Sequence, residues 1–409
     1  MHVDARSLPD GAYAWRRLAV SLAIATIGGV GLWSAVVALP VIQAEFGLDR
    51  GGASIPYTAT MVGFALGGVA MGRLADRFGI RVPLMLAATM LAVGYAVAAA
   101  AQSYVQFVLA QALLIGMLGS SASFGPLVAD VSHWFVRRRG IAVAIAASGN
   151  YLAGTIWPPL LHEGFAILGW RTTHLLLGLF CIATMLPLAF LLRRRPTFDA
   201  VPTASDRSPA LPAAPPPLLQ PLLVLAGFAC CMAMSMPQVH LAAYCTDLGY
   251  GPARGTEMLS LMLGLGVVSR LASGMIADRI GGAGTLVLGS ALQCLALLFY
   301  LPFDGLASLF LVSALFGLSQ GGIVPSDALI VRDRFPAREA GTRVSLVLTA
   351  TVLGMAVGGW LSGAIHDLTG SYAAAFVNGI AWNLVNLAIA CWLLLDGRRG
   401  RHGVFAPAV

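Results

Sequence analysis

Twelve apolar runs, each long enough to cross a lipid bilayer, dominate this sequence. A helix needs about 20 mostly apolar residues to span the hydrocarbon core. Runs of that size begin near residues 18, 53, 82, 105, 140, 172, 220, 256, 284, 305, 343 and 373, and short segments that carry Arg or Gly separate them. Barrel strands are only about 10 residues long and alternate in polarity. The pattern therefore predicts an all-α membrane protein with twelve transmembrane helices.

Composition excludes a water-soluble fold. Hydrophobic residues make up 58% of the chain and charged residues 11%, whereas soluble domains are about 25% charged. A soluble chain could not cover so much apolar surface, but lipid covers the outer face of every membrane helix. We therefore expect the lipid bilayer to be a partner of this protein.

The arginines indicate how the helices are oriented. The chain contains no Lys, and the predicted outer loops contain only Arg50, Arg171 and Arg254. Arg270 falls inside an apolar run, and all the other arginines fall on the opposite side. Cytoplasmic loops carry such an excess of positive charge. We expect a multi-pass protein of the bacterial inner membrane with both termini in the cytoplasm, and this placement explains the net charge of +7 without nucleic acid.

The chain divides into two similar halves. A Pro-rich linker, 196–217, separates a predicted six-helix bundle at 18–195 from a second at 218–396, with cytoplasmic tails at 1–17 and 397–409. The segment Gly72–Gly79 recurs as Gly274–Gly281, 202 residues later, and Gly169 and Gly370 mark a second pair of similar positions. Parallel repeats of this kind are typical of transporters whose substrate site lies near the midplane between the halves.

The segment from Gly72 to Arg81 reads G-R-L-A-D-R-F-G-I-R, and it resembles the loop between the second and third helices of the major facilitator superfamily. The resemblance implies the fold of that family, with two six-helix bundles, and a gating role for the motif. Asp76 would then meet the positive start of the eleventh helix at Gly341–Arg343, or Arg139. The alternative is a tight turn with a topology signal. The gating residues would be Gly72, Asp76, Arg77, Gly79 and Arg81, with Asp278 and Arg279 in the second copy.

A narrower resemblance concerns the segments 10–15 and 134–142, which are similar to signatures of the monocarboxylate transporters and the oxalate:formate antiporters. This branch implies a carboxylate substrate and proton coupling. The sequence departs from it in having no Lys, and in having Gly266 where the branch has an Asp one turn before its helix-eight Arg. These departures argue against a dicarboxylate that needs two cationic contacts.

Arg270 is the predicted substrate-binding residue. A guanidinium near the bilayer centre costs about 2.5–3.5 kcal/mol on insertion scales, and such residues usually mark function. No acidic residue lies one turn away on the same helix, and the planar fork of Arg binds a carboxylate through two hydrogen bonds. The resembling carriers use an Arg of this helix for that purpose. The alternative is a structural ion pair with an acid such as Asp130 or Asp327.

Other polar residues within the apolar runs are weaker candidates, because such groups also form hydrogen bonds between helices. The further substrate-binding candidates are Asn150, Tyr151, Gln238, His240, Trp33 and Gln320. The candidates for proton coupling are Asp130, Asp327 and His240.

The sequence does not predict an enzyme, a cofactor or a metal site. A nucleotide-binding Walker A loop needs a Lys, and no zinc-ligand spacing is present. We expect a monomeric secondary transporter that moves a small organic monocarboxylate by alternating access, together with a proton or a counter-anion. The alternatives are a carrier of another organic anion, an exporter of hydrophobic compounds, and a membrane sensor that binds a ligand without moving it.

Overall fold

The computed structural model describes residues 10–192 and 218–403. For residues 337, 338 and 397–403 it describes the backbone only. The linker at 196–217, the first nine residues of the N-terminal tail and residues 404–409 lie outside the described residues. The chain forms two compact units, Met1–Val201 with Val239–Gly264, and Pro202–Gln238 with Leu265–Val409. The boundaries fall inside α10 (Leu219–Asp247) and α11 (Pro252–Phe299). The two compact units therefore do not coincide with the two halves of the sequence repeat.

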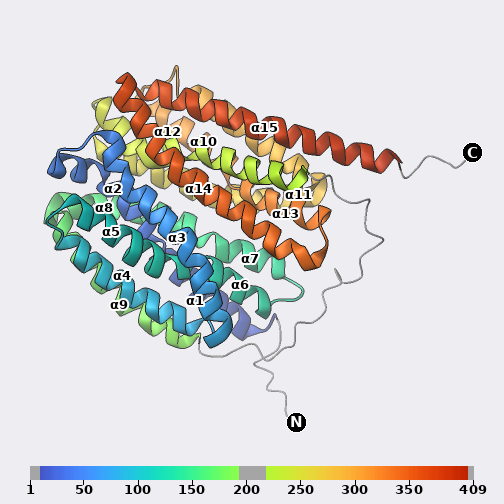
Figure 1. Ribbon diagram of the computed structural model, residues 1–409, viewed down its shortest axis with the longest axis horizontal. Coiled ribbons are helices and arrows are strands. Elements are labelled where there is room, and N and C mark those ends of the chain that lie inside the picture. The colour runs from blue at the N-terminus through green and yellow to red at the C-terminus, as the bar shows by residue number, and fades with distance from the viewer. Residues whose placement is uncertain (1–9, 193–217, 404–409) are drawn as a thin grey trace, which may run out of the picture. The chain divides into compact units, whose positions relative to one another are not determined.

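The first unit is a bundle of membrane-length helices. Its elements are α1 (Ala12–Gly28), α2 (Val30–Phe46), α3 (Arg50–Phe78), α4 (Arg81–Ala99), α5 (Tyr104–Leu109), the π-helix η2 (Ala110–Gly119), the 3-10 helix η3 (Ser120–Ser123), α6 (Gly125–Trp134), α7 (Arg139–Ala147), α8 (Gly149–Leu168) and α9 (Trp170–Leu191). In Figure 1, α4 and α9 run side by side, and their contact is the most extensive in this unit. Leu84, Leu91 and Tyr95 of α4 lie fully buried in its core.

Small residues bring α3 against η2. A Cβ atom built on Gly67 would overlap with the carbonyl oxygen of Met117, and one on Gly63 would overlap with that of Ala112. Membrane helices use such positions because lipid provides no hydrophobic force between helices and close backbone packing replaces it. Gly68, the next residue along α3, has nothing within 4 Å of a built Cβ.

The fourth predicted run, which begins near residue 105, corresponds to the candidate span Tyr104–Trp134, whose backbone is irregular. It passes from α-helix to π-helix at Ala110, to 3-10 helix at Ser120, and back to α-helix at Gly125. The start of the 3-10 segment is closely packed against α2, because a Cβ on Gly31 would overlap with Oγ of Ser120. Segments of π-helix inside α-helices are rare and frequently occur at functional sites.

The second unit contains α12 (Leu306–Gln320), α13 (Ile323–Arg334), α14 (Ala337–Thr369), α15 (Tyr372–Gly403) and the remaining parts of α10 and α11. The unusual length of α11 has a simple explanation. Gly281 has φ 78° and ψ 167°, so two helices meet there. In the same unit a Cβ on Gly354 of α14 would overlap with the carbonyl oxygen of Phe228 of α10.

Eleven helical stretches of the described residues are long and apolar enough to span a membrane. The break at Gly281 divides the longest of them, Pro252–Phe299, into two of the twelve predicted helices. Each predicted run begins within six residues of an observed helix start or of the break at Gly281. Large apolar side chains point outward, including Leu66, Leu311 and Leu368, which are 62%, 72% and 87% exposed. The predicted all-α membrane fold is confirmed.

Candidate functional site

The repeated motif has the same backbone in both copies. Gly79 ends α3 with φ 82° and ψ 160°, and Gly281 breaks α11 with φ 78° and ψ 167°. A positive φ is the region that L side chains avoid and that glycine adopts freely. The N–H of Gly79 also donates to the carbonyl oxygen of Ala75 at 2.7 Å, which closes the last turn. The glycine therefore fixes the turn that follows each copy of the motif.

A cavity of about 620 Å³ lies beside the first copy of the motif, within the first unit. Its lining includes Gly72, Asp76, Gly79 and Arg81. Arg81 is held by an aromatic ring, because its guanidinium carbon lies 4.2 Å from the ring centroid of Phe190. The lining also includes three polar residues from other helices: Arg17, Asp130 and His133. The fold thus joins the motif to charged groups from α1 and α6.

The predicted gating partners of Asp76 have hydrogen bonds of their own. Arg343 donates to Glu339 one turn earlier, through Nη2 at 2.9 Å and Nε at 3.2 Å. Arg139 donates to Oγ of Ser132 at 3.4 Å. Asp76 is exposed at the end of α3. Arg77, Asp278 and Arg279, the other charged gating candidates, are also exposed. The gating role of the motif stays a prediction.

Asp130, a candidate proton carrier, is one half of a buried ion pair. Its carboxylate accepts from Nε and Nη2 of Arg17, each at 2.8 Å. The Arg17 side chain is 1% exposed and that of Asp130 10%. Arg17 also donates to the carbonyl oxygen of Leu192 at 3.3 Å and lies 4.7 Å from the ring centroid of Trp134. Two parallel hydrogen bonds are the bidentate geometry of an Arg–carboxylate pair, and proton coupling through Asp130 stays a prediction.

The two segments that resemble monocarboxylate-carrier signatures contact each other. Asp10 donates its backbone N–H to the carbonyl oxygen of Trp134 at 3.1 Å. Its carboxylate accepts from the backbone N–H groups of Val136 at 3.2 Å, Arg137 at 3.0 Å and Arg138 at 3.1 Å. Edge-to-face ring contacts support the junction, between Tyr13 and Trp134 and between Trp15 and Phe135.

This junction should depend on pH. Burial raises the pKa of Asp10, but the hydrogen bonds from the backbone N–H of Arg137, Arg138 and Val136 lower it by more, so the pKa lies below its ordinary value. A carboxyl whose pKa falls on folding stabilises the protein above its unfolded pKa, and that contribution is lost as the pH falls through the folded pKa. We expect Asp10→Asn to lower the melting temperature near neutral pH, and the difference from wild type to shrink in acid.

The measurement is the melting temperature in detergent from about pH 7 to about pH 3. Asp304→Asn is the matched control, because it removes the same charge from an exposed position of the α11–α12 connection. A difference between wild type and Asp10→Asn that stays constant over this range would contradict the assignment.

Arg270 lies deep within the span formed by the first part of α11 and is half-buried. Its backbone is at a tight helix crossing, because a Cβ on Gly321 would overlap with the backbone nitrogen of Arg270. Next to it, Ser269 donates to the carbonyl oxygen of Leu318 at 2.6 Å and accepts from the N–H of Gly321 at 3.2 Å. This close contact fixes where the backbone of Arg270 lies relative to Gly321.

The structure brings two of the weaker candidates together in the first unit. Nε1 of Trp33 on α2 donates to the backbone carbonyl oxygen of Asn150 on α8 at 3.2 Å. The indole packs against Gly154, where a Cβ would lie 2.6 Å from it. Tyr151 is 8% exposed and His240 fully buried, also within this unit. Trp33 and Asn150 therefore form one cluster with Gly154.

The candidates of the second unit form another cluster. Nε2 of Gln238 on α10 donates to Oε1 of Gln320 on α12 at 2.6 Å, and both side chains are buried. Asp327 of α13 is fully buried, and neither of its carboxylate oxygens has a hydrogen-bond partner in the described part of the chain. Asp130 pairs with Arg17. Substrate contact by Arg270 stays a prediction, with a structural ion pair as its alternative.

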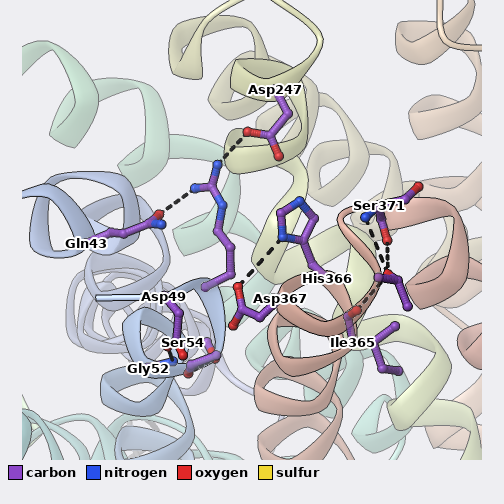
Figure 2. A network of polar contacts seen from close by, with 12 residues as sticks. Gln43, Asp49, Gly52, Ser54, Asp247, Ile365, His366, Asp367 and Ser371 are labelled. Carbon is purple, nitrogen blue, oxygen red and sulfur yellow. Dashed lines mark hydrogen bonds and ion pairs between the residues drawn. The ribbon is translucent and has the colours of Figure 1, made fainter. Parts of the chain in front are cut away.

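Sequence reasoning missed a charged network at the other end of the first unit. The guanidinium of Arg50 donates to Oε1 of Gln43 at 2.6 Å and to Oδ1 of Asp247 at 2.5 Å. Gln43 and Asp247 are labelled in Figure 2. Arg171 also forms an ion pair with Glu45, at 2.5 Å. In the sequence, Arg50 and Arg171 served only to indicate the orientation of the helices. Their partners are distant in sequence, and only the fact that acids also occur near these helix ends could have suggested them.

Comparison with known proteins identifies the family. A family model described as Major Facilitator Superfamily matches residues 22–311 and 283–406. The chain belongs to the major facilitator superfamily. This facilitator is therefore a multi-pass secondary transporter of a small molecule and not an enzyme.

The facilitator has curated relatives with different names. It is 28% identical over 385 residues to monocarboxylate transporter 13 of Bos taurus, which covers 90% of this chain and 86% of the relative. It is 24% identical over 376 residues to the agnestins efflux protein AgnL12 of Paecilomyces divaricatus, over 90% of this chain and 83% of the relative. Among solved structures it matches a bacterial homologue of the human lysosomal transporter Spinster, with a TM-score of 0.71, 15% identity and coverage of 97% and 100%. That structural likeness shows the fold alone.

Proposed function

We propose that this facilitator moves a small organic monocarboxylate across the bacterial inner membrane, coupled to protons, by alternating access. Arg270 is the observation that carries the proposal. It places a guanidinium within a membrane span, where an anionic ligand offsets the cost of burying the charge. The similarity to monocarboxylate transporter 13 of Bos taurus over most of the chain supports the same substrate class.

The orientation of the protein and its assembly belong to the same proposal. Both termini lie in the cytoplasm, and the arginine distribution supports this orientation. The protein functions as a monomer. Arg270 binds the substrate carboxylate through the two parallel hydrogen bonds that guanidinium offers. Neighbouring candidates such as Gln238 and Gln320, which are already joined by a hydrogen bond, contribute polar contacts to the rest of the substrate.

The test is uptake of labelled monocarboxylates into proteoliposomes, with and without an inward proton gradient. We expect Arg270→Lys to lower uptake roughly 10- to 100-fold, because a hydrogen bond to a charged group contributes about 1.5–3 kcal/mol. Lys keeps the charge but lacks the planar fork. Arg254→Lys is the matched control on the same helix, since Arg254 is 51% exposed and pairs only one turn away with Glu257.

The efflux relative favours a second candidate, the export of a larger hydrophobic compound. The same vesicles decide between the two. Uptake that requires a carboxylate on the substrate and is lost in Arg270→Lys supports the carboxylate carrier. Absence of carboxylate flux in folded wild-type protein, together with movement of uncharged hydrophobic compounds, would refute it.

A further inference from the structure

A carboxyl group lies buried without a donor in the middle of the second unit. Asp327 of α13 is fully buried, and Oδ1 and Oδ2 both lack a hydrogen-bond partner among the described residues. Ion pairs in the described part of this unit include those of Arg334 with Asp396, Arg343 with Glu339 and His366 with Asp367. Asp327 takes part in none of them.

The surroundings of Asp327 are polar on one side only. Asp327 lies close enough to Cys230 of α10 for the two groups to interact electrostatically. The sulfur atoms of Cys230 and Cys231 are 3.6 Å apart. Nε2 of Gln293 on α11 donates to the carbonyl oxygen of Cys230 at 3.4 Å, and its Oε1 has no hydrogen-bond partner in the described residues. Asp327 thus lies near the Cys230 thiol, and no cation forms a hydrogen bond with its carboxylate among the described residues.

These groups form a row along the contact between α10 and the pair α12–α13. Cys230 and Gln238 are eight residues apart on α10, which is about 12 Å along the helix axis. They face Asp327 and Gln320, which are seven residues apart on the partner segments. The amide of Gln320 also has an unsatisfied nitrogen, Nε2. The row therefore offers hydrogen-bonding positions at both levels that no group among the described residues fills.

The other elements packed against α13 present apolar groups, or charges that form no hydrogen bond with Asp327 among the described residues. The glycines of α11 at 282 and 289 approach Leu329, Ile330 and Ile323. In α14, Arg343 and Glu339 pair with each other, as do His366 and Asp367. The remaining ionisable residues of α11 are Arg254 and Glu257, which pair with each other in the first unit, and Arg270, Asp278, Arg279 and Cys294. None of these forms a recorded ion pair or hydrogen bond with Asp327.

An ionised carboxylate without a partner is unfavourable in such a buried position. Burying an unpaired charge costs several kcal/mol even after the protein relaxes, and an acid in that position takes up a proton instead. A metal cation is a poor alternative, because the described residues contain no group of three or more His, Cys, Asp or Glu side chains that could hold one. Protonation, in contrast, requires only one oxygen of the Asp327 carboxylate.

We propose that Asp327 is the proton-carrying residue of the transport cycle. This inference rests on the proposed function, that is, on proton-coupled carriage of a monocarboxylate. In the state seen here the Asp327 carboxyl holds a proton. In the opposite state water reaches the carboxyl, its O–H bond breaks and the proton leaves on the side to which the protein is open. Proton and carboxylate anion then cross together, and the pair carries no net charge.

The decisive variant is Asp327→Asn, because an amide has the shape of the protonated acid and cannot release a proton. Two transport modes are compared in proteoliposomes. Exchange of labelled for unlabelled monocarboxylate at equal pH needs no net proton movement, whereas uphill accumulation needs the proton gradient. We expect Asp327→Asn to keep exchange within about twofold of wild type and to lose accumulation entirely. Asp304→Asn, which removes an exposed acid, should leave both unchanged.

The outcomes separate the two proposals. If wild-type protein shows no carboxylate flux in either mode, the proposed function fails. If wild type accumulates substrate and Asp327→Asn does so equally well, Asp327 is not the proton carrier. Loss of both modes in Asp327→Asn would also overturn the assignment, since it would mean a structural or binding role.

A second measurement, which needs no substrate, tests the protonation of Asp327 directly in the wild-type protein. Infrared difference spectra of the detergent-solubilised wild type should contain the carbonyl band of a protonated carboxylic acid, which disappears on titration to alkaline pH. The band should be present in Asp304→Asn and absent in Asp327→Asn. Its persistence in Asp327→Asn would assign the protonated acid to another residue.

Discussion

Gly67→Ala is expected to cause the largest loss of stability of any single methyl group added to the first unit. The new Cβ would overlap with the carbonyl oxygen of Met117, and a backbone atom cannot rotate away as a side chain can. Overpacking costs about 1–3 kcal/mol when side chains adjust, and more when they cannot. Here α3 must move away from η2, and the close contact that replaces hydrophobic attraction in lipid is lost.

Gly68→Ala is the matched control, because it makes the same change one residue further along α3 where nothing lies within 4 Å of the new Cβ. In a soluble helix interior this substitution would even help, by roughly 0.5–1 kcal/mol. The measurement is the yield of monodisperse protein and its melting temperature in detergent. Equal stabilities for the two variants would show that α3 and η2 are not held at the separation described.

Arg17→Met should produce the second large effect. It leaves the carboxylate of Asp130, 10% exposed, without the guanidinium that gives it two hydrogen bonds. Removing one partner of a buried ion pair typically costs about 3–5 kcal/mol, because the other charge stays buried. Met fills much of the space of the Arg stem, so the loss comes mainly from charge. We expect a strongly lowered melting temperature.

Two further variants test the reason for this loss. Arg16→Met is the control, since Arg16 is adjacent in sequence and exposed, and it should stay close to wild type. Adding Asp130→Leu to Arg17→Met should restore most of the stability, because an apolar pair can replace a buried ion pair at little cost. A double variant less stable than Arg17→Met alone would mean that Asp130 has a role beyond this pair.

The apolar runs were sufficient to predict the helices, because a bilayer imposes one length on every span. Deviations from regular helix could not be predicted in the same way. The tight turn of Gly281 was predictable, since it repeats the position of Gly79 in the motif. The change to π-helix at Ala110 was not, because Ala, Leu and Ile fit either kind of helix.

Charged partners were predicted less well than charged positions. Asp130 and Arg270 were singled out because ionisable groups inside spans are costly. The sequence could not reveal that Arg17 lies opposite Asp130, since 113 residues separate them. The segments 10–15 and 134–142 were recognised separately as signatures. Only the fold shows that Asp10 of the first accepts hydrogen bonds from the backbone of the second.

The irregular backbone of the span from Tyr104 to Trp134 has a consequence for experiments that scan it residue by residue. A regular helix turns 100° per residue, so labelling of successive cysteines would rise and fall with a constant period of 3.6. The π-helical stretch Ala110–Gly119 turns less per residue and the 3-10 stretch Ser120–Ser123 turns more. Two oscillations should therefore appear, one along Tyr104–Leu109 and one along Gly125–Trp134, and neither can be extrapolated into the other. A single helical wheel drawn through the whole crossing would assign residues of one end to the wrong face.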